Sequence, residues 1–326
     1  MRRIAAALSV IGALGALVPG VVQPGWAQTY PNRTVRLIIP FPAGGPVDVM
    51  GRLVAQHLSS TLGQQVICDN RPGAGSTIAG REVARAEPDG YTLLLGSAAT
   101  LAIGPAVFKN IGYDPITSFT PVGFISNVPY VMVAGPKAPA KSVQDVIAYA
   151  KANPGKLNLG VPNGAPPHML AAWFKDITAT DIVVVPYKGA STVITDMIGG
   201  QIDLGFETTS VTLSHLSDGS IRPLGVATKE RMPELAGVPT MMESGVPDFI
   251  AASWTGIMAP AGTPPEVIAK LNDAINAAVK SPEMQARFKQ LVAQPSPGTP
   301  QDFAAFISVE APKWTAMAKL SNLKAE

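Results

Sequence analysis

Residues 35–70 read VRLIIPFPAGGPVDVMGRLVAQHLSSTLGQQVICDN, and this stretch decides the fold class. Its first part, Val35 to Phe41, is rich in apolar and β-branched residues, as expected for a buried strand. Val47 to Leu62 then repeats apolar residues at helical spacing, and Gln65 to Cys68 is a second strand-like run. A strand, a helix and a strand in this order form a βαβ unit. The stretch therefore predicts an α/β protein with a parallel sheet.

The same alternation continues along the chain in two sets. A helix over Thr77 to Ala86 and a strand over Tyr91 to Leu95 complete the first set. The second set contains the predicted helices Val143 to Ala152, His168 to Ile177 and Ser191 to Ile198, and the predicted strands Leu157 to Val161, Ile182 to Val185, Ile202 to Phe206 and Leu224 to Ala227. Two sets of this kind indicate two α/β lobes.

Two long β-like segments without a helix, Pro121 to Ala134 and Phe249 to Pro260, separate these sets. We expect both to be crossings between the lobes. Three further helices follow, roughly Pro265 to Lys280, Glu283 to Leu291 and Gln301 to Lys319, and we expect them to return the chain to the first lobe. Residues 28–125 and 254–326 would then form a discontinuous lobe 1 and residues 126–253 lobe 2. A cleft between two lobes is the natural place for a ligand.

The first residues predict export. Arg2 and Arg3 carry positive charge, Ile4 to Val18 is uncharged and apolar, and Gly25-Trp26-Ala27 supplies small residues for cleavage. We therefore assign residues 1–27 to a signal peptide and expect the mature chain to begin near Gln28. A retained membrane anchor is the alternative, but glycines and a proline interrupt the apolar run.

Charge and composition exclude several classes of partner. The whole chain has a net charge of +2, and removal of Arg2 and Arg3 leaves it neutral. A neutral surface argues against nucleic acid or an anionic membrane as the partner. The Gly73-Ala74-Gly75-Ser76 turn lacks the third glycine of a dinucleotide site and follows the second strand, so we expect no nucleotide cofactor.

The sequence shows no sign of a catalytic site. It contains no Gly-x-Ser-x-Gly motif, and its three histidines, His57, His168 and His215, stand at no metal-ligand spacing. We therefore expect no catalytic residue and no metal. His168 is the histidine worth testing as a base or a hydrogen-bond donor, since it lies beside the expected cleft.

Several stretches, taken together and in this order, resemble the Bug/TctC family of substrate-binding proteins of tripartite tricarboxylate transporters. They are PAGGPVD (42–48), NRPGAG (70–75), PDGYTLL (88–94), NPGKLN (153–158), VPYKG (185–189) and APAGTP (259–264). The resemblance covers essentially the whole mature chain.

The resemblance implies a type II periplasmic-binding-protein fold without a cofactor. It also implies a periplasmic receptor, expected to be a monomer, for a small carboxylate such as a dicarboxylic, amino or aromatic acid. Such a receptor delivers its ligand to a membrane permease of two further subunits. A periplasmic sensor for a signalling partner shares this fold and is the alternative, and a secreted hydrolase is the less favoured class.

The candidate binding residues of lobe 1 follow its strands. Phe41, Gly44, Gly45 and Asp48 lie at the first strand-to-helix junction, where unpaired N–H groups and the helix dipole attract a carboxylate. A plain tight turn is the alternative there, and Asp48 is either a ligand contact or a helix-start residue. Ser97, Ala98 and Thr100 follow a strand at its carboxyl end, and the hydroxyls of Ser97 and Thr100 bind ligand or cap the next helix.

The candidates of lobe 2 occupy three further loops. They are Asn163, Gly164, Ala165 and His168 in the first loop, Tyr187, Gly189 and Ala190 in the second, and Glu207 and Thr208 in the third. Lys188 is expected to face solvent, because lysine is seldom buried without a partner. Glu207 would repel a carboxylate, so it points away, neutralises a ligand ammonium or caps a loop.

Overall fold

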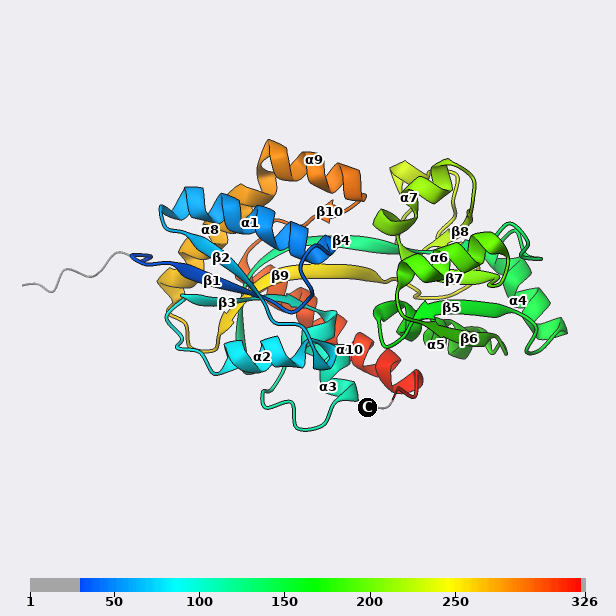
Figure 1. Cartoon of the computed structure of the whole chain (residues 1–326), viewed down its shortest axis with the longest axis horizontal. Helices are drawn as coiled ribbons and strands as arrows, with labels where there is room; N and C mark the ends of the chain where they lie inside the picture. Colours follow the sequence, from blue (N-terminus) through cyan, green and yellow to red (C-terminus); the bar gives the residue numbers. More distant parts are fainter. Residues whose placement is uncertain (1–29, 324–326) are drawn as a thin grey trace, which may run out of the picture.

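The computed structural model describes residues 30–323, so the predicted signal peptide lies outside the described residues. Figure 1 shows two α/β halves joined by two long strands, β4 (Phe119–Ala134) and β9 (Ala252–Pro260). The strands follow one path in the order β2-β1-β3-β9-β4-β7-β5-β6, with β8 and β10 paired to β4. The two sets of elements expected from the sequence are thus joined through β4 and not separated into two sheets.

The first half contains β1 (Val35–Ile39), α1 (Pro46–Leu62), β2 (Val66–Asn70), η1 (Ala74–Ser76), α2 (Thr77–Ala84), β3 (Thr92–Ser97), η2 (Ala99–Ile103) and α3 (Gly104–Val107). After β9 it is completed by α8 (Pro265–Lys280), α9 (Pro282–Leu291), β10 (Gln294–Pro295) and α10 (Pro300–Leu320). The helices η2 and α3 and the short strand β10 were not expected from the sequence, because they are too short to show a period.

The second half contains α4 (Val143–Ala152), β5 (Asn158–Pro162), α5 (Pro166–Thr178), β6 (Val183–Tyr187), α6 (Ala190–Gly199), β7 (Leu204–Thr208), α7 (Thr209–Ser217), β8 (Arg222–Val226) and η3 (Pro233–Leu235). In each half, three strands are parallel: β1 pairs with β2 and β3, and β5 pairs with β6 and β7. Parallel strands bring their carboxyl ends, and the loops that follow them, to one edge of the sheet.

The strand β4 changes its partners along its length. Phe119 to Pro129 pair with β9, whereas Tyr130 to Ala134 pair with β7 and β8. One strand therefore belongs to both halves, which explains why its 16 residues read as a crossing without a helix. The predicted division into residues 28–125 with 254–326 and residues 126–253 stays a prediction. Because the sheet continues through β4, the strand order alone does not define where one lobe ends.

The last helix does more than return to the first half. Helix α10 packs against η2 and α3 of the first half, and it also packs against α5 of the second half (Figure 1). One hydrophobic cluster accordingly runs from Leu94 in the first half through Trp314 on α10 to Phe174 on α5. Besides the two crossing strands, packing by α10 therefore also connects the halves.

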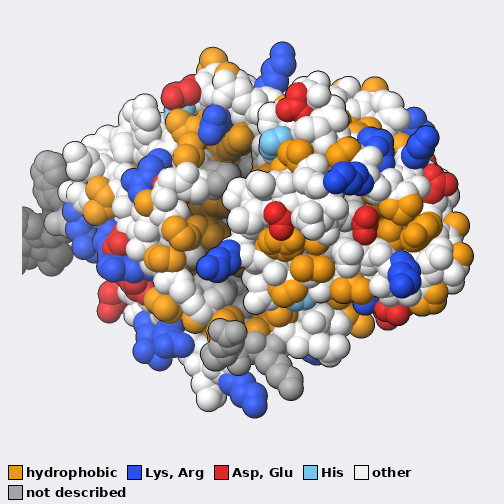
Figure 2. All heavy atoms as spheres, turned by 45° about the vertical axis from the view of Figure 1, so that its right-hand side comes forward, with side chains coloured by type: hydrophobic (Ala, Val, Ile, Leu, Met, Phe, Trp, Pro, Cys, Tyr) orange, Lys and Arg blue, Asp and Glu red, His pale blue; other side chains and the backbone are white. Residues whose placement is uncertain are grey.

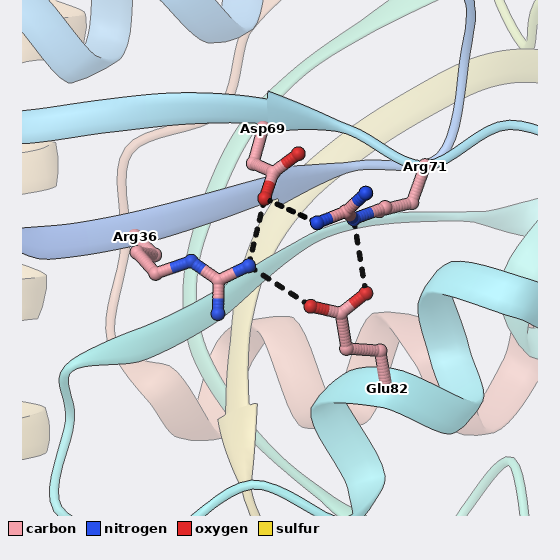
Figure 3. A network of polar contacts seen from close by, with 4 residues as sticks. All are labelled: Arg36, Asp69, Arg71 and Glu82. Atoms are coloured by element: carbon pink, nitrogen blue, oxygen red, sulfur yellow. Dashed lines mark hydrogen bonds and ion pairs between the residues drawn. The ribbon is translucent and has the colours of Figure 1, made fainter.

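A network of four charged side chains fixes one end of the first sheet. Figure 3 shows Arg36 of β1 and Arg71 between the carboxylates of Asp69 on β2 and Glu82 on α2. The N···O distances run from 2.7 to 3.2 Å. Since Arg71 is held by both acids, the turn after β2 is tied to α2 and the Arg71 guanidinium is already paired.

Candidate ligand-binding cleft

Two adjoining cavities lie where the halves meet, and Figure 2 shows the surface hollowed along this line. One has a volume of about 160 Å³ and the other about 130 Å³. They share Val47 on α1 and Ser253 and Thr255 on β9. We call the larger one the aliphatic cavity, because Met50, Val128 and Leu291 line it. The smaller one, lined by Phe41, Tyr130, Trp254 and Trp314, is the aromatic cavity.

Both halves contribute walls to these cavities. From the first half, Ser97, Ala98 and Ala99 line the aromatic cavity directly after β3. From the second half, Pro166 lines the aromatic cavity, and Thr208 and Ser210 line the aliphatic cavity. The carboxyl ends of the parallel strands in the two halves therefore face one cleft.

A row of hydroxyl groups forms the floor of the cleft. Ser97 on β3 pairs with Thr255 on β9, and Thr255 pairs with Ser126 on β4. Residues directly opposite each other on neighbouring strands point to the same face, and Ser253 joins them because it lies two residues before Thr255. Ser97 Oγ is buried and has no hydrogen-bond partner among the described residues, so it is available to a ligand.

The edge of β9 is also open to the cleft. The pairing of β3 with β9 ends at Ser97 and Thr255, while β9 runs on to Ala252. Residues 252–254 of β9 therefore have no partner strand among the described residues on the side where β3 pairs with the rest of β9. In an antiparallel strand, every second residue directs its backbone N–H and C=O to the same side. Backbone groups therefore add to the polar lining.

The helices that begin at the cleft lack side-chain caps. These are α1, α5, α6 and α7, whose N-cap residues are Gly45, Ala165, Gly189 and Thr208. By contrast, Ser142, Ser281 and Thr299 cap α4, α9 and α10. Helices α2, α3 and α8 are also uncapped, and α8 begins at the far end of β9. First-turn N–H groups have no partner inside a helix, so an uncapped start attracts an anion.

Asp48 shapes the start of α1. Its carboxylate accepts hydrogen bonds from the Gly44 N–H (2.8 Å), from Arg52 Nε (2.9 Å) and from Asn70 Nδ2 (2.7 Å). Burial alone would raise the pKa of Asp48, but the hydrogen bonds from Arg52, Asn70 and Gly44 lower it to about 2. Asp48 is thus a buried anion that holds the loop before α1, and its predicted ligand contact stays a prediction.

Of the other lobe 1 candidates, Phe41, Ser97 and Ala98 line the aromatic cavity. Gly44 and Gly45 lie in the loop directly before Val47, which lines both cavities. Gly44 has a φ of +85°, so glycine is favoured there for its backbone conformation. Thr100 is fully buried, and its Oγ1 has no hydrogen-bond partner in the described part of the chain.

The lobe 2 candidates are brought together but lie back from the cavities. The Asn163 N–H donates to the Tyr187 carbonyl (2.9 Å), which joins the first two loops. Only Thr208 among these candidates lines either cavity; Asn163, Gly164, Ala165, His168, Tyr187, Gly189, Ala190 and Glu207 do not. His168 accepts a hydrogen bond from the Gly164 N–H (3.4 Å) and faces a separate cavity beside the end of α10.

Glu207 is buried in β7 beside the cleft. Its backbone pairs with Val131 of β4, its exposed fraction is 3%, and its Oε1 has no hydrogen-bond partner among the described residues. Burial raises the pKa of Glu207 to about 8, so the side chain is largely neutral at neutral pH. It therefore does not bring a full negative charge to the cleft.

No Lys, Arg or His side chain of residues 30–323 lines the two cavities. Arg71 is paired in the network of Figure 3, and Lys188 is exposed. Within the same residues, no group of three His, Cys, Asp or Glu side chains could hold a metal ion, and no helix is long and apolar enough to cross a membrane. An anion in either of these two cavities would be bound by N–H and hydroxyl groups.

The site includes residues that were not predicted from the sequence. Ser126, Ser253 and Thr255 were missed because both segments were interpreted only as crossings between the lobes. The local signal was the alternation of hydroxyl residues at 253 and 255 within an otherwise apolar segment. The aromatic side chains Tyr130, Trp254 and Trp314 gave no such signal, because buried aromatic residues usually belong to the core.

Residues 50–323 match the family described as tripartite tricarboxylate transporter family receptor, TctC. Among curated proteins, the chain is 37% identical to Protein BugT of Bordetella pertussis, over 97% of this chain and 98% of BugT. Among solved structures, it is similar to R. palustris Rpa4515 with adipate, at 36% identity and a TM-score of 0.78, over 90% of this chain and 99% of that one. MatC from Rhodopseudomonas palustris with bound malate has 31% identity and a TM-score of 0.75, over 89% of this chain and 100% of that one.

Proposed function

The chain belongs to the family of tripartite tricarboxylate transporter receptors, TctC, and from this premise we propose that its cleft captures a small carboxylate for uptake. The periplasmic-binding-protein fold expected from the sequence is confirmed, and the chain is a solute-binding receptor and not an enzyme.

The observation that carries the proposal is the uncapped start of α1 above a floor of hydroxyl groups. The N–H groups of Val47 and Asp48 stand at the positive end of a 17-residue helix, and the Asp48 side chain is turned back to Gly44 and Arg52. A carboxylate at this place receives charge-assisted hydrogen bonds of about 1.5–3 kcal/mol each. Ser97 Oγ, buried and unpartnered, offers a further donor in the same cavity.

The solved relatives support this ligand class. Rpa4515 was solved with adipate and MatC with malate, and both ligands are small dicarboxylates. Neither the aliphatic nor the aromatic cavity has a lining cation among the described residues, so these two cavities fit recognition by hydrogen bonds and not by ion pairs.

We expect the second half to complete the site by closing. Its loops at 163–165 and 187–190 line neither cavity, yet both lie at the edge that faces the cleft. Rotation about β4 and β9 would bring the uncapped starts of α5 and α6 onto the ligand. Helix α10 packs on both halves, so its contact with α5 must slide or break during this motion.

The cellular setting is part of the proposal. We expect export to the periplasm with cleavage near Ala27, a monomeric receptor, and transfer of the ligand to the two membrane subunits of a tripartite transporter. The family assignment and the charged, then apolar, first residues support this setting.

Titration calorimetry of the purified protein with adipate, malate and other small acids tests the proposal. We expect at least one small carboxylate to bind and the matched neutral amide not to bind, because an amide cannot replace the anion at the start of α1. X-ray scattering with saturating ligand should show a smaller radius of gyration. A folded protein that binds no carboxylate of a broad panel, or that binds amide and acid alike, would overturn the assignment.

A further inference from the structure

The residue that ends α9 adopts a strained backbone conformation. Helices α1 and α6 end at Gly63 and Gly200, whose φ values of +70° and +78° lie in the left-handed region. Glycine suits that region because it has no Cβ. Val292 ends α9 with a φ of +49° and a ψ of +38°, although a β-branched side chain is strongly disfavoured there. Strain of this kind persists only where surrounding contacts hold the residue in place.

Contacts with the other half hold the Val292 side chain. Val292 follows α9 of the first half, yet it is buried in a hydrophobic cluster whose other buried members, among the described residues, lie between Val131 and Val238. Its neighbours Leu291 and Ala293 pack in a different cluster, which includes residues of α1 and α8. The Val292 side chain therefore reaches into the second half, while the residues on either side of it pack on the first.

A hydrogen bond accompanies this packing. Thr209, the first residue of α7, is buried, and its Oγ1 donates to the Val292 carbonyl at 3.4 Å. Helix α7 of the second half and α9 of the first half lie side by side at this point (Figure 1). We call Val292 and Thr209 the α7–α9 clasp. It joins the halves at a place separate from the crossing strands and from α10.

The residues next to the clasp line the aliphatic cavity. Leu291 precedes Val292, and Thr208 and Ser210 flank Thr209. Leu291, Thr208 and Ser210 all line the cavity, so a ligand there lies against both segments that the clasp holds together. Separation of the halves on this side would part Thr209 from Val292 and expose the valine side chain to water, which costs free energy.

We propose that Val292 is a positioning residue, which holds the two halves together beside the aliphatic cavity through the α7–α9 clasp and slows the release of a bound acid. This inference rests on the proposed function, because it needs a ligand between the halves. It explains why α9 ends in a strained valine where α1 and α6 end in glycine, since glycine has no side chain to place in the second half.

Val292→Gly separates this role from that of an ordinary helix end. Glycine relieves the strain but removes the side chain from the second half, so the two effects on stability oppose each other and the melting temperature should shift by less than about 5 °C. Release of a bound acid should become about tenfold faster, because the burial of one valine side chain no longer opposes opening. Stopped-flow dilution of protein loaded with adipate or malate measures this rate.

Ala179→Gly is the matched control. Ala179 ends α5 with a φ and a ψ of +49° and with the same pattern of backbone hydrogen bonds, but it is exposed. This substitution relieves the same kind of strain and should leave the release rate unchanged within about twofold. Thr209→Val removes only the hydroxyl of the clasp. Because its bond to Val292 is long, release should accelerate by about threefold, less than in Val292→Gly.

A distance measurement tests the clasp without a ligand. Spin labels on Ser214→Cys of α7 and Lys289→Cys of α9, both at exposed positions, report the separation of the two helices, and Cys68→Ser removes the other thiol. In this background, Val292→Gly should add a population with a longer distance between the labels. Electron–electron resonance measures the distribution.

Three results would overturn the inference. They are an unchanged release rate in Val292→Gly, an equal acceleration in Ala179→Gly, and label distances that Val292→Gly leaves unchanged. If no acid binds, the proposed function fails, and the label distances then decide by themselves whether Val292 holds α7 against α9.

Discussion

The two walls of the cleft differ in how firmly they are held. In the first half, the loop before α1 is fixed through Asp48, whose buried carboxylate joins Gly44, Arg52 and Asn70. In the second half, the Asn163 N–H donates to the Tyr187 carbonyl and so joins the loops at 163–165 and 187–190, and the Gly164 N–H makes a long contact to His168 within the first of them. Among the described residues, many from the first wall line the cavities, whereas those from the second wall are Pro166, Thr208 and Ser210.

This difference suggests a division of roles. A preformed wall loses little conformational freedom when it binds, so it supplies most of the initial affinity. A wall that lies back from the cavities contributes only after closure. The same substitution made at equivalent positions of the two walls can therefore distinguish residues that capture the ligand from residues that act only after the receptor closes.

The largest effect should come from Asp48→Ala in the first wall. It removes three hydrogen bonds to a buried anion and leaves the Gly44 N–H without its side-chain partner, although Asn70 keeps its bond to the Phe41 carbonyl, so we expect a loss of about 3–5 kcal/mol in the free energy of unfolding. Urea denaturation measures this loss. Arg52→Ala removes only a partner that is half exposed and should cost about 1 kcal/mol or less. Equal losses in the two variants would show that Asp48 does not hold this wall.

The next effect compares the N-cap glycines of α1 and α6. Neither Gly45 nor Gly189 has a positive φ, and an added Cβ would meet nothing closer than 3.7 Å at Gly45 and nothing within 4 Å at Gly189. Both variants to valine should therefore fold. Gly45→Val should weaken carboxylate binding at least about a hundredfold, because the branched side chain covers the N–H groups that bind the anion.

Gly189→Val should weaken binding by about tenfold or less, because α6 meets the ligand only after closure. Titration calorimetry with the same acid measures both losses, and thermal melts check that both proteins are folded. A loss at Gly189 as large as that at Gly45 would contradict the division of roles between the walls.

The buried acids of the two walls should respond to pH in opposite directions. Asp48 has its pKa lowered to about 2, so its stabilisation is present above its unfolded pKa near 4 and is lost as pH falls toward 2. Glu207 has its pKa raised from 4.5 to about 8, so its contribution is fully present below pH 4.5 and is lost as pH rises through 8. Between pH 6 and 8, this loss amounts to about 2 kcal/mol.

Glu207→Gln isolates that effect. The glutamine cannot ionise, so the variant should lose less stability than the unmodified protein between pH 6 and 8, by about 2 kcal/mol. Urea denaturation at a series of pH values measures the difference. If the two proteins lose stability in parallel over this range, then Glu207 is not a buried neutral acid.

Local patterns in the sequence were enough to predict most of the elements. The helices α1, α4 and α8 and the strands β1 and β5 lie close to the expected ranges, because their apolar residues repeat with a clear period. The loop at Gly44 and Gly45 was likewise marked by its glycines, and the ordered set of motifs indicated the family. These features depend on residues that are neighbours in the chain.

The parts that were missed depend on contacts between distant residues. The hydroxyl row joins residues 97, 126 and 255, and only the register of β3, β9 and β4 brings them together. In the same way, nothing local to α10 shows that it packs on α5 as well as on α3. Whether Asp48 faces a ligand or its own loop was also undecided, because Asn70 lies 22 residues away.

The smallest effect should come from Lys188→Ala in the second wall. Lys188 is exposed, lines neither cavity and stands directly before Gly189, the N-cap of α6. An exposed ion pair contributes about 0–1 kcal/mol, so this variant should weaken carboxylate binding less than about fivefold, and added salt should remove most of that loss. Calorimetry at low and high salt measures both quantities. A loss greater than that of Gly45→Val would place the carboxylate beside Lys188, and the second wall, not the first, would then be the one that captures the ligand.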